Sequence, residues 1–575
     1  MLTMNSSKEN SWKHQQQVID SKIKSVEEAI HAEIKSLEDT IHGLTRRRNT
    51  LAPISSLPPE VIAAIFFLLR GVRLPDPDHG LPESFLALRV AQVCHHWRQI
   101  SLENPLLWSH FDFTTVSPAG ATEILARARM TPLSLVAIDP SYRRWDDARF
   151  FSFQKELQTH TFHTFYLRLD ISGSVLNKTL EGLIFPAPIL ETLSLSVERK
   201  SRASVVPDTL FDGTAPKLSS LRLSNCDISW KSSLLKGLKT LEIRRSPTAV
   251  MPHLTVWLGA LEEMPQLERL VLDSASPRSP SVPYNPEYFV TLPSLSHLDI
   301  YAPVLDCGLA LSHLTLPVLT SLCVTARADN LTARNVKEIS PYISKYSHGR
   351  QDTRPLRSVF IHKEWSRLDV LAWRTPHIDV PAWDSGRSAH VELSFITNDE
   401  SGRDLDNYVE VLGMAMDALS LRNLVMLTSP CATQLDVDFW RKQAAKWPLL
   451  ERVDLAPLSA RGFIEMLLED NGGREGPLLP SLTYLRLIGN SLSENRFSLV
   501  RDTLMKRVEQ GVPLEVLDLR MCSVPNLLVR LLSEVVVDVW GPTESKMETE
   551  KPMNGMSMTW DGVRCPFLCG GDDLE

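Results

Sequence analysis

The chain has 575 residues, of which 43% are hydrophobic and 23% are charged, a composition ordinary for a globular protein. The length predicts more than one structural unit, or one elongated repeat array. The formal net charge of −8 is small for this length, so no global field argues for binding to nucleic acid or to an anionic membrane.

Targeting signals are missing from the sequence as it stands. The longest clean apolar run, residues 61–69, is far too short to span a bilayer. Residues 1–17 are polar, lack the apolar core of a signal peptide and are predicted to be disordered. We therefore expect a cytoplasmic or nuclear protein that makes no membrane contact. The eight cysteines are spread thinly, which fits reduced thiols in such a compartment better than a disulfide framework.

Residues 18–50 predict one helix of the coiled-coil type. Its apolar residues recur at steps of three and four, and they are Ile19, Ile23, Val26, Ile30, Ile34, Leu37, Ile41 and Leu44. Charged residues fill the flanks, as a short coiled coil requires. Two successive steps of four around Ile30 form a stutter. The helix either folds back onto the protein or forms a homodimer, and three to four heptads are too marginal to decide between the two.

Residues 51–115 predict a small helical domain. The segment begins with Leu57-Pro-Pro-Glu-Val-Ile-Ala-Ala-Ile-Phe66 and resumes with Val93-Cys-His-His-Trp-Arg-Gln-Ile100. It ends with Asn104-Pro-Leu-Leu-Trp108. Either proline fits the first turn of a helix, and the following glutamate lies favourably on the helix dipole. The first helix is apolar on every side, so one of its faces needs a partner.

These three phrases, in this order, resemble the F-box-like domain in the form common among fungal F-box proteins. The resemblance implies a three-helix module that docks the Skp-type adaptor of a cullin–RING ubiquitin ligase. It also implies the adaptor-binding residues, which are Leu57, Pro58, Ile62, Ile65, Leu68, Val93 and Trp97. Residues 70–82 depart from the family by forming a long loop between the first two helices.

Residues 116–540 repeat one phrase, Leu-x-x-Leu-x-Leu or a near equivalent. Its clearest copies begin at Leu190, Leu218, Leu238, Leu267, Leu295, Leu319, Leu356, Leu450, Leu482 and Leu514. The last two apolar residues point the same way from a short strand, and stacked units share one long core. We predict an α/β fold, an irregular leucine-rich-repeat solenoid, with a generic α/β domain as the alternative. Helices on its convex side are expected at residues 252–263, 439–447, 460–469 and 497–510.

Two stretches fit this repeat poorly. Residues 329–408 contain few copies of the phrase and are expected to be a long insertion between repeats. Residues 541–575 are rich in Gly, Pro, Met and charge, and they predict a disordered tail. Cys565 and Cys569 in this tail have the closest spacing of any cysteine pair. They are expected to be unpaired thiols, because no other His or Cys lies near them in sequence to complete a metal site.

No catalytic motif is present. The sequence contains no phosphate-binding glycine loop, no His-Glu-x-x-His and no Gly-x-Ser-x-Gly. Cys94 and the two histidines after it are adjacent on a helix and therefore point apart, and the resemblance implies that Cys94 is a packed residue. His160 and His163 share a helical face, but we expect them to be surface residues. We predict a protein that is not an enzyme and needs no cofactor or metal.

The sequence thus predicts a substrate-recognition subunit of an SCF-type ubiquitin ligase, with the repeats binding a target protein. The expected target contacts lie between buried strand positions on the concave face. They are Arg222, Glu242, Arg244, Asp273, Asp299, Tyr301, Phe360, His362, Asp454, Arg486, Asp518 and Arg520. Mixed charges with a few aromatic residues suit a protein or peptide. The alternative is a ligase-independent scaffold that self-associates through residues 18–50.

Overall fold

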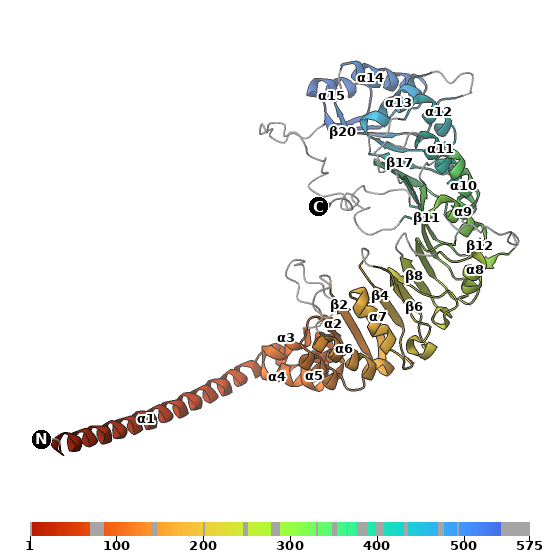
Figure 1. Ribbon diagram of the computed structural model, residues 1–575. Helices are drawn as coiled ribbons and strands as arrows, with labels where there is room; N and C mark the ends of the chain where they lie inside the picture. Colours follow the sequence, from red (N-terminus) through yellow and green to blue (C-terminus); the bar gives the residue numbers. More distant parts are fainter. Residues whose placement is uncertain are drawn as a thin grey trace. The chain divides into compact units, whose positions relative to one another are not determined.

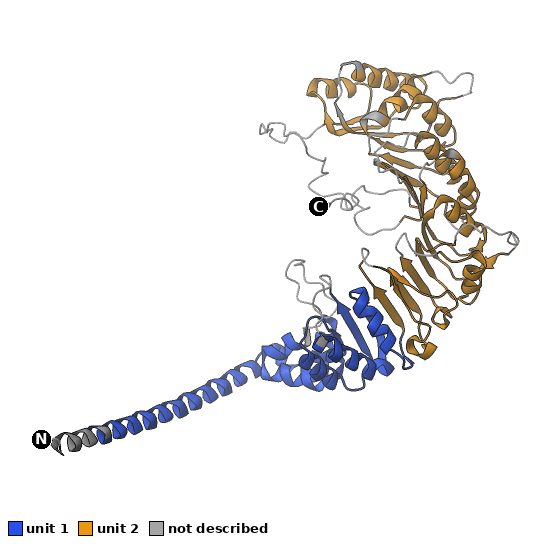
Figure 2. Ribbon diagram, in the orientation of Figure 1, with its two compact units in different colours: residues 1–190 blue, residues 191–575 orange. Residues whose placement is uncertain are grey.

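The computed structural model divides into two compact units, residues 1–190 and residues 191–575 (Figure 2). The residues that it describes are 3–69, 86–139, 147–198, 202–244, 251–277, 288–328, 332–347, 354–364, 366–375, 389–397, 408–430, 435–469, 476–491 and 494–541. The predicted loop at residues 70–82 and almost all of the predicted tail lie outside these ranges. Among the helices described, none has the length and apolarity needed to cross a membrane.

The first unit begins with one long helix, α1 (Thr3–Thr50) (Figure 1). The helix predicted over residues 18–50 therefore begins earlier, and residues 3–17 are helical rather than disordered. This stretch contains no Gly or Pro, and its Lys, Glu and Gln residues favour a helix. The eight apolar residues of the predicted coiled-coil pattern stay exposed, from 49% at Ile34 to 63% at Leu44. The helix therefore does not fold its apolar side back onto its own unit.

A group of short helices follows α1. They are η1 (Pro53–Ser56), α2 (Pro59–Leu69), α3 (Leu86–Val93), α4 (His95–Glu103) and η3 (Pro105–Trp108). We call residues 53–108 the helical module. The remainder of the unit alternates strands and helices: β1 (His110–Asp112), α5 (Pro118–Ala128), β2 (Leu133–Ile138), α6 (Asp147–His160), η4 (Thr161–His163), β3 (Thr164–Asp170) and α7 (Gly173–Gly182). Strand β2 pairs in parallel with both β1 and β3.

The second unit continues this alternation. Its strands are β4 (Thr192–Ser196), β5 (Ser204–Val205), β6 (Ser220–Ser224), β7 (Cys226–Asp227), β8 (Thr240–Arg244), β9 (Arg269–Asp273), β10 (Val290–Thr291), β11 (His297–Pro303), β12 (Leu314–Thr315), β13 (Ser321–Ala328), β14 (Ser358–Glu364), β15 (Arg367–Trp373), β16 (Val391–Thr397), β17 (Met426–Ser429), β18 (Arg452–Leu455), β19 (Tyr484–Ser491), β20 (Val516–Ser523) and β21 (Asp538–Trp540). Its helices are η5 (Leu210–Gly213), η6 (Ser233–Leu235), α8 (Leu254–Glu262), α9 (Val304–Ser312), α10 (Ala333–Ser347), α11 (Tyr408–Ala418), α12 (Val437–Ala444), α13 (Pro457–Leu468), α14 (Glu494–Glu509) and α15 (Asn526–Leu532).

A large, mostly parallel sheet forms the second unit. Hydrogen-bonded neighbours follow the order β4-β6-β8-β9-β11-β13-β16-β15-β14-β17-β18-β19-β20-β21. Within this order β15 alone is antiparallel to its neighbours. The helices from α9 to α14 lie along one face of the sheet (Figure 1). Neighbouring members of this group contact one another, as α9 does α10 and α12 does α13.

The repeated leucine phrase places its apolar residues in register. Leu193 faces Leu221, which faces Leu241, and the same row continues to β13. The second apolar residues of the phrase form a parallel row two residues further on. Both rows are buried, because alternate strand residues share one face. Stacked apolar rows of this kind form one continuous core, as the sequence predicted.

Backbone hydrogen bonds repeat along with the leucines. The amides of Glu268 and Arg269 both donate to the carbonyl of Lys239, at 2.7 and 3.0 Å. In the same way, the amides one strand later donate to the carbonyl of Glu268. The same pair of donors thus recurs between these neighbouring strands. The naming of these units as leucine-rich repeats, and of the whole as a solenoid, stays a prediction.

The four helices expected at residues 252–263, 439–447, 460–469 and 497–510 correspond to α8, α12, α13 and α14. The region expected to be an insertion, residues 329–408, contains α10 and the β14-β15-β16 segment. Its strands enter the sheet, but out of chain order, because β13 pairs with β16 and β14 pairs with β17. The insertion therefore extends the sheet instead of leaving it.

Candidate functional site

The helical module has a small aromatic core of its own. Ile62 and Phe66 of α2 are fully buried, and the ring of Phe66 lies 4.9 Å from that of Trp97 on α4. Trp108 is 1% exposed, and its indole Nε1 donates to the carbonyl of Ser101 at 2.7 Å. The guanidinium of Arg127 on α5 lies 4.7 Å from the Trp108 ring centroid. These contacts fix α2, α4 and η3 against each other.

The sequence places caps where these helices begin. The Sγ of Cys94 accepts a hydrogen bond from the amide of Trp97 at 3.5 Å, at the start of α4. The Oδ1 of Asn104 accepts one from the amide of Leu106 at 3.1 Å, at the start of η3. Cys94 is therefore a capping residue, and its contact with the backbone gives it a structural role.

The opposite side of α2 is apolar and open to solvent. Val61 is 43% exposed and Leu68 is 73% exposed, while Ala64 is exposed and Ile65 is half-buried. Residues three, four and seven apart lie on one face of a helix, so these four side chains form a single stripe. We call Val61, Ala64, Ile65 and Leu68 the α2 outer face. Because the inner face of α2 is already packed, this stripe is left available to a partner.

The seven predicted adaptor residues separate into three groups by exposure. Leu57, Pro58, Leu68 and Val93 are exposed. Ile65 and Trp97 are half-buried. Ile62 has no exposed surface and packs the core of the module, so we correct its assignment from a docking residue to a core residue.

Sequence reasoning did not select Val61, although it is exposed beside Leu68. The signal was available, because Val61, Ile65 and Leu68 follow the four-and-seven spacing of one helical face. Phe67 and Leu69 are also exposed, by 49% and 44%, at the margins of the same helix. The apolar surface of α2 is thus wider than the predicted set.

The second candidate surface is a row of side chains across the sheet of the second unit. Strand register places seven of the predicted target residues in one row, which are Arg222, Glu242, Asp299, Phe360, Asp454, Arg486 and Asp518. A second row, two residues further along the strands, holds Arg244, Asp273, Tyr301 and His362. Arg520 lies two residues beyond Asp518 on β20. The sequence pattern therefore placed these residues on one face correctly.

At the C-terminal end of this row, charged and aromatic side chains pack together. The guanidinium of Arg520 binds Asp518 through Nε at 3.0 Å and through its terminal nitrogen at 2.8 Å. Arg486 Nε lies 3.5 Å from the same carboxylate, and the hydroxyl of Tyr484 donates to it at 2.7 Å. Arg520 lies 4.7 Å from the ring centroid of Trp540. We call Arg452, Tyr484, Arg486, Arg520 and Trp540 the arginine–aromatic cluster.

Two aspartates hold this cluster from below. Asp454 binds both Nε and the terminal nitrogen of Arg452 at 3.1 Å, and its side chain is fully buried, as is that of Asp518. Burial alone would raise the pKa of Asp518, but hydrogen bonds from Arg520 and Tyr484 outweigh it and hold this pKa below its ordinary value. Both aspartates therefore position arginines, which corrects their assignment as target contacts.

Ionic contacts between strands also occur in the first half of the sheet. The Oε1 of Glu242 lies 3.7 Å from Nε of Arg222 and 3.2 Å from Nε of Arg269. Burial raises the pKa of Asp299 on the next strand. Tyr301 lies beneath the guanidinium of Arg327 at 5.5 Å. In the pair of Arg222 and Glu242 the arginine is the part that faces solvent, because the side chain of Arg222 is 55% exposed and that of Glu242 is 16% exposed.

His160 and His163, expected at the surface, are instead packed with a carboxylate. His163 is 5% exposed, and its Nε2 lies 3.3 Å from Nδ1 of His160. Glu156 lies four residues before His160, with 3.6 Å between Oε2 and Nε2, and Thr122 donates to Glu156 at 2.7 Å. Burial lowers the pKa of both histidines. Even so, no three His, Cys, Asp or Glu side chains in the described parts of the chain converge closely enough to hold a metal ion.

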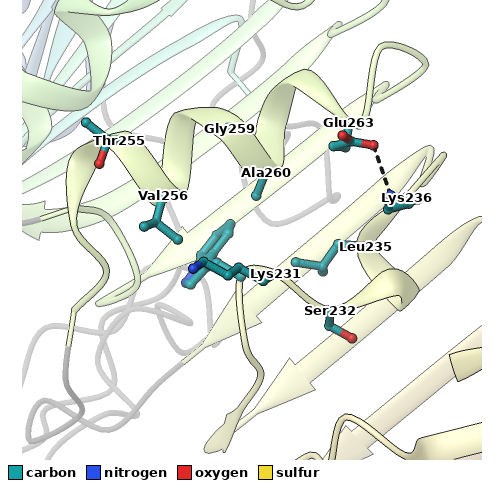
Figure 3. A pocket seen from close by; sticks show the side chains of 10 residues that line it. Lys231, Ser232, Leu235, Lys236, Thr255, Val256, Gly259, Ala260 and Glu263 are labelled. Carbon is teal, nitrogen blue, oxygen red and sulfur yellow. Dashed lines mark ion pairs between the residues drawn. The ribbon is translucent and has the colours of Figure 1, made fainter. Parts of the chain in front are cut away.

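A pocket of about 390 Å³ lies between η6 and α8 in the second unit (Figure 3). Its lining includes Trp230, Ser232 and Val256, and an ion pair joins Lys236 to Glu263 at 3.4 Å. The Ser232 hydroxyl accepts a hydrogen bond from the amide of Leu234 and caps η6. The lining residues thus form no pair of nucleophile and base, and the pocket does not alter the expectation of a binding protein.

The comparisons with known proteins agree with the helical module. Residues 54–114 match the family model described as F-box-like, and this range contains α2, α3, α4 and η3. F-box domains typically bind Skp-type adaptors, so the match suggests an adaptor-binding role in a ubiquitin ligase. No curated protein matches the chain.

Proposed function

We propose that the protein is a substrate-recognition subunit of a cullin–RING ubiquitin ligase. In this proposal the α2 outer face binds a Skp-type adaptor and through it a cullin, and the exposed sheet face of the second unit binds a target protein. The observation that carries the proposal is the exposed apolar stripe on α2, inside the segment that matches the F-box-like domain. The chain acts by proximity, because it holds the target near the transfer machinery. It contributes no acid, base or nucleophile to the transfer.

The docking part of the proposal rests on the free energy gained when the apolar α2 outer face is removed from water. Leu68, at 73% exposure, is the most exposed large apolar side chain of α2, and Val93 on α3 adds a further 59% exposed side chain. Full burial of a Leu or Val contributes about 1.5–3 kcal/mol. Burying these residues against an adaptor would therefore supply a substantial part of a binding free energy. Charge contributes little to this surface, because its residues are apolar.

The target part rests on the arginine–aromatic cluster. Arg, Tyr and Trp are the residue types that most often dominate protein interfaces. Here the arginines and Tyr484 are already held in place by Asp454 and Asp518, so little of their side-chain freedom is lost on binding. Arg520 and Trp540 keep 48% and 40% of their surface exposed. The cluster is therefore suited to an acidic or polar segment of a target protein.

One co-purification experiment tests both parts. Three versions of the full chain are added to a fungal extract and recovered with the proteins that they bind. They are the wild type, the α2 variant Val61→Asp/Leu68→Asp and the cluster variant Arg520→Ala/Trp540→Ala. Mass spectrometry identifies the bound proteins. We expect the α2 variant to lose adaptor and cullin, because a carboxylate cannot be buried in an apolar interface without a partner. The cluster variant should retain adaptor and cullin but lose at least one other protein.

The matched control is Met130→Asp/Phe151→Asp. Met130 and Phe151 are apolar residues of the same unit, and they are 67% and 66% exposed. Both lie outside residues 54–114. This control should bind adaptor like the wild type. Undiminished adaptor binding by the α2 variant would reject the docking surface. Absence of adaptor and cullin from the wild-type complex would instead favour the ligase-independent scaffold.

A further inference from the structure

The apolar side of α1 has no role in the proposed function, and it is organised in layers. Position a of each heptad is isoleucine, at Ile23, Ile30, Ile34 and Ile41. Position d holds Ile19, Val26, Leu37 and Leu44. Every one of these eight side chains is between 49% and 63% exposed. We call them the α1 seam.

We propose that the α1 seam binds the α1 seam of a second copy of this chain, in a parallel, in-register, two-stranded coiled coil. In the second half of the seam, Ile34-Leu37-Ile41-Leu44, position a is isoleucine and position d is leucine, the pattern that favours two parallel strands, whereas the first half has β-branched residues at both positions. A seam this narrow, with charged flanks, is complementary to another seam of the same period. The occupant is therefore a second α1.

The flanking charges of a parallel pair balance. In a parallel pair, Lys22 at position g of one copy lies beside Glu27 at position e of the other, and symmetry makes this contact twice. The parallel pair also places Glu33 of one copy beside Glu38 of the other. The attractive contact between Lys22 and Glu27 is thus offset by one repulsive contact.

An antiparallel pair would be worse. Aligning Ile23 with Leu44 of the other copy sets Lys22 against Arg47, and Glu27 against Glu38. Every charged contact named for that alignment is repulsive, and like charges across a coiled coil select against a pairing. The charge pattern thus distinguishes between two orientations that the apolar seam alone would accept.

The stutter between Ile30 and Ile34 fits this arrangement. Two a-type residues four apart unwind the supercoil locally, so the two halves of the coil follow slightly different paths. An in-register pair places the stutter of one chain beside the stutter of the other. Both chains then unwind at the same layer, whereas a shifted register would oppose an unwound layer to a wound one.

The parallel orientation has a consequence for the helical module. α1 ends at Thr50, and η1 begins at Pro53 within the same unit. Two parallel copies therefore carry their helical modules at the same end of the coil. The inference does not depend on adaptor binding, because α1 and α2 use separate surfaces.

The mass of the full chain in solution tests the proposal first. Sedimentation equilibrium of the wild type at micromolar concentration should give a dimer, and Ile30→Lys/Ile34→Lys should raise the dissociation constant by about 100-fold or more. Lys22→Glu and Glu27→Lys should each weaken the dimer by about 3- to 10-fold, and the two changes together should restore it. The matched control Lys24→Glu makes the same charge change at an outer position, and it should behave like the wild type. A monomeric or trimeric wild type would overturn the proposal.

Cysteine cross-linking tests the orientation. Identical seam residues face each other only in a parallel, in-register pair, so Ile23→Cys should form a disulfide-linked dimer on mild oxidation. Wild type under the same oxidation is the control for the native cysteines. Cross-linking that occurs only when Ile23→Cys is mixed with Leu44→Cys would show an antiparallel pair and overturn the proposal. These outcomes are independent of adaptor binding, which the α2 variant reports.

Discussion

The helical module and the sheet face of the second unit present opposite kinds of surface. On α2, the exposed residues Val61 and Leu68 are apolar. On the sheet, charged side chains are paired with charges on neighbouring strands before any partner arrives, as Arg486 on β19 is with Asp518 on β20. The first surface gains free energy simply by leaving water, whereas the second must exchange existing contacts for new ones.

This difference suits the two tasks that we propose. A surface that binds by apolar burial is tolerant of small changes in its partner, as a common adaptor requires. A surface of preformed ion pairs rejects partners that leave a buried charge unmatched, as a selective receptor requires. Three changes, one in the module and two in the sheet, would break or sharpen this contrast.

The largest effect is expected inside the module. Ile62→Asp places a carboxylate in a site with no exposed surface, and we expect a loss of about 4 kcal/mol or more of unfolding free energy. Leu68→Asp on the outer face should change stability by about 0.5 kcal/mol or less. Hydrogen–deuterium exchange over residues 86–108 reports the result locally. Equal protection in the two variants would contradict the separation of α2 into a core face and an outer face.

An intermediate effect is expected in the arginine–aromatic cluster. Asp518→Asn removes the negative charge that Arg486 and Arg520 share, and we expect a loss of about 3 kcal/mol of unfolding free energy. The matched control is Asp502→Asn. Asp502 Oδ1 lies 3.0 Å from a terminal nitrogen of Arg501, whose side chain is 47% exposed. The loss of unfolding free energy there should be about 0.5 kcal/mol. Urea unfolding measures both. Similar losses would show that the cluster is held by packing and not by its buried carboxylates.

The smallest effect is a pH dependence from His297. Burial, with a smaller contribution from Arg269, lowers the pKa of His297 to about 4 in the folded chain. The unfolded histidine binds its proton near pH 6.5, so between these two values the unfolded state binds more protons. Stability should therefore be full above about pH 6.5 and fall as the pH drops toward 4. Thermal unfolding at several pH values should show this slope reduced in His297→Gln, and an unchanged slope would exclude His297 as its source.

The sequence predicted local features well. The leucine phrase located strands such as β6 and β8, and helical periodicity located α8, α12, α13 and α14. These signals are local, because the periodicity of apolar residues over a short stretch indicates which side of a strand or helix is buried. The F-box-like segment was also recognised, because its phrases keep their order along the chain.

Features that depend on contacts across the fold were missed. Sequence could not separate Ile62 from Leu68, because both are apolar residues of a helix that is apolar on every side. It did not connect Glu156 with the two histidines, nor show that Asp454 and Asp518 lie beneath arginines. The pairing of β13 with β16 joins residues far apart in the chain, and no periodicity reports it. Helical residues 3–17 were missed because polarity was taken as disorder.

The out-of-order strands in the sheet affect how the second unit reaches its folded state. In an array of stacked repeats, order can spread from each unit to the next along the chain. Here that spread stops at β13, because the next long strand in sequence, β14, is not its neighbour. A loop spanning α10, β14 and β15 must close before β16 can pair, which carries an entropic cost that short connections avoid. We therefore expect the strands before β13 and those after β17 to behave as two folding segments, which the β14-β15-β16 segment connects in the folded sheet.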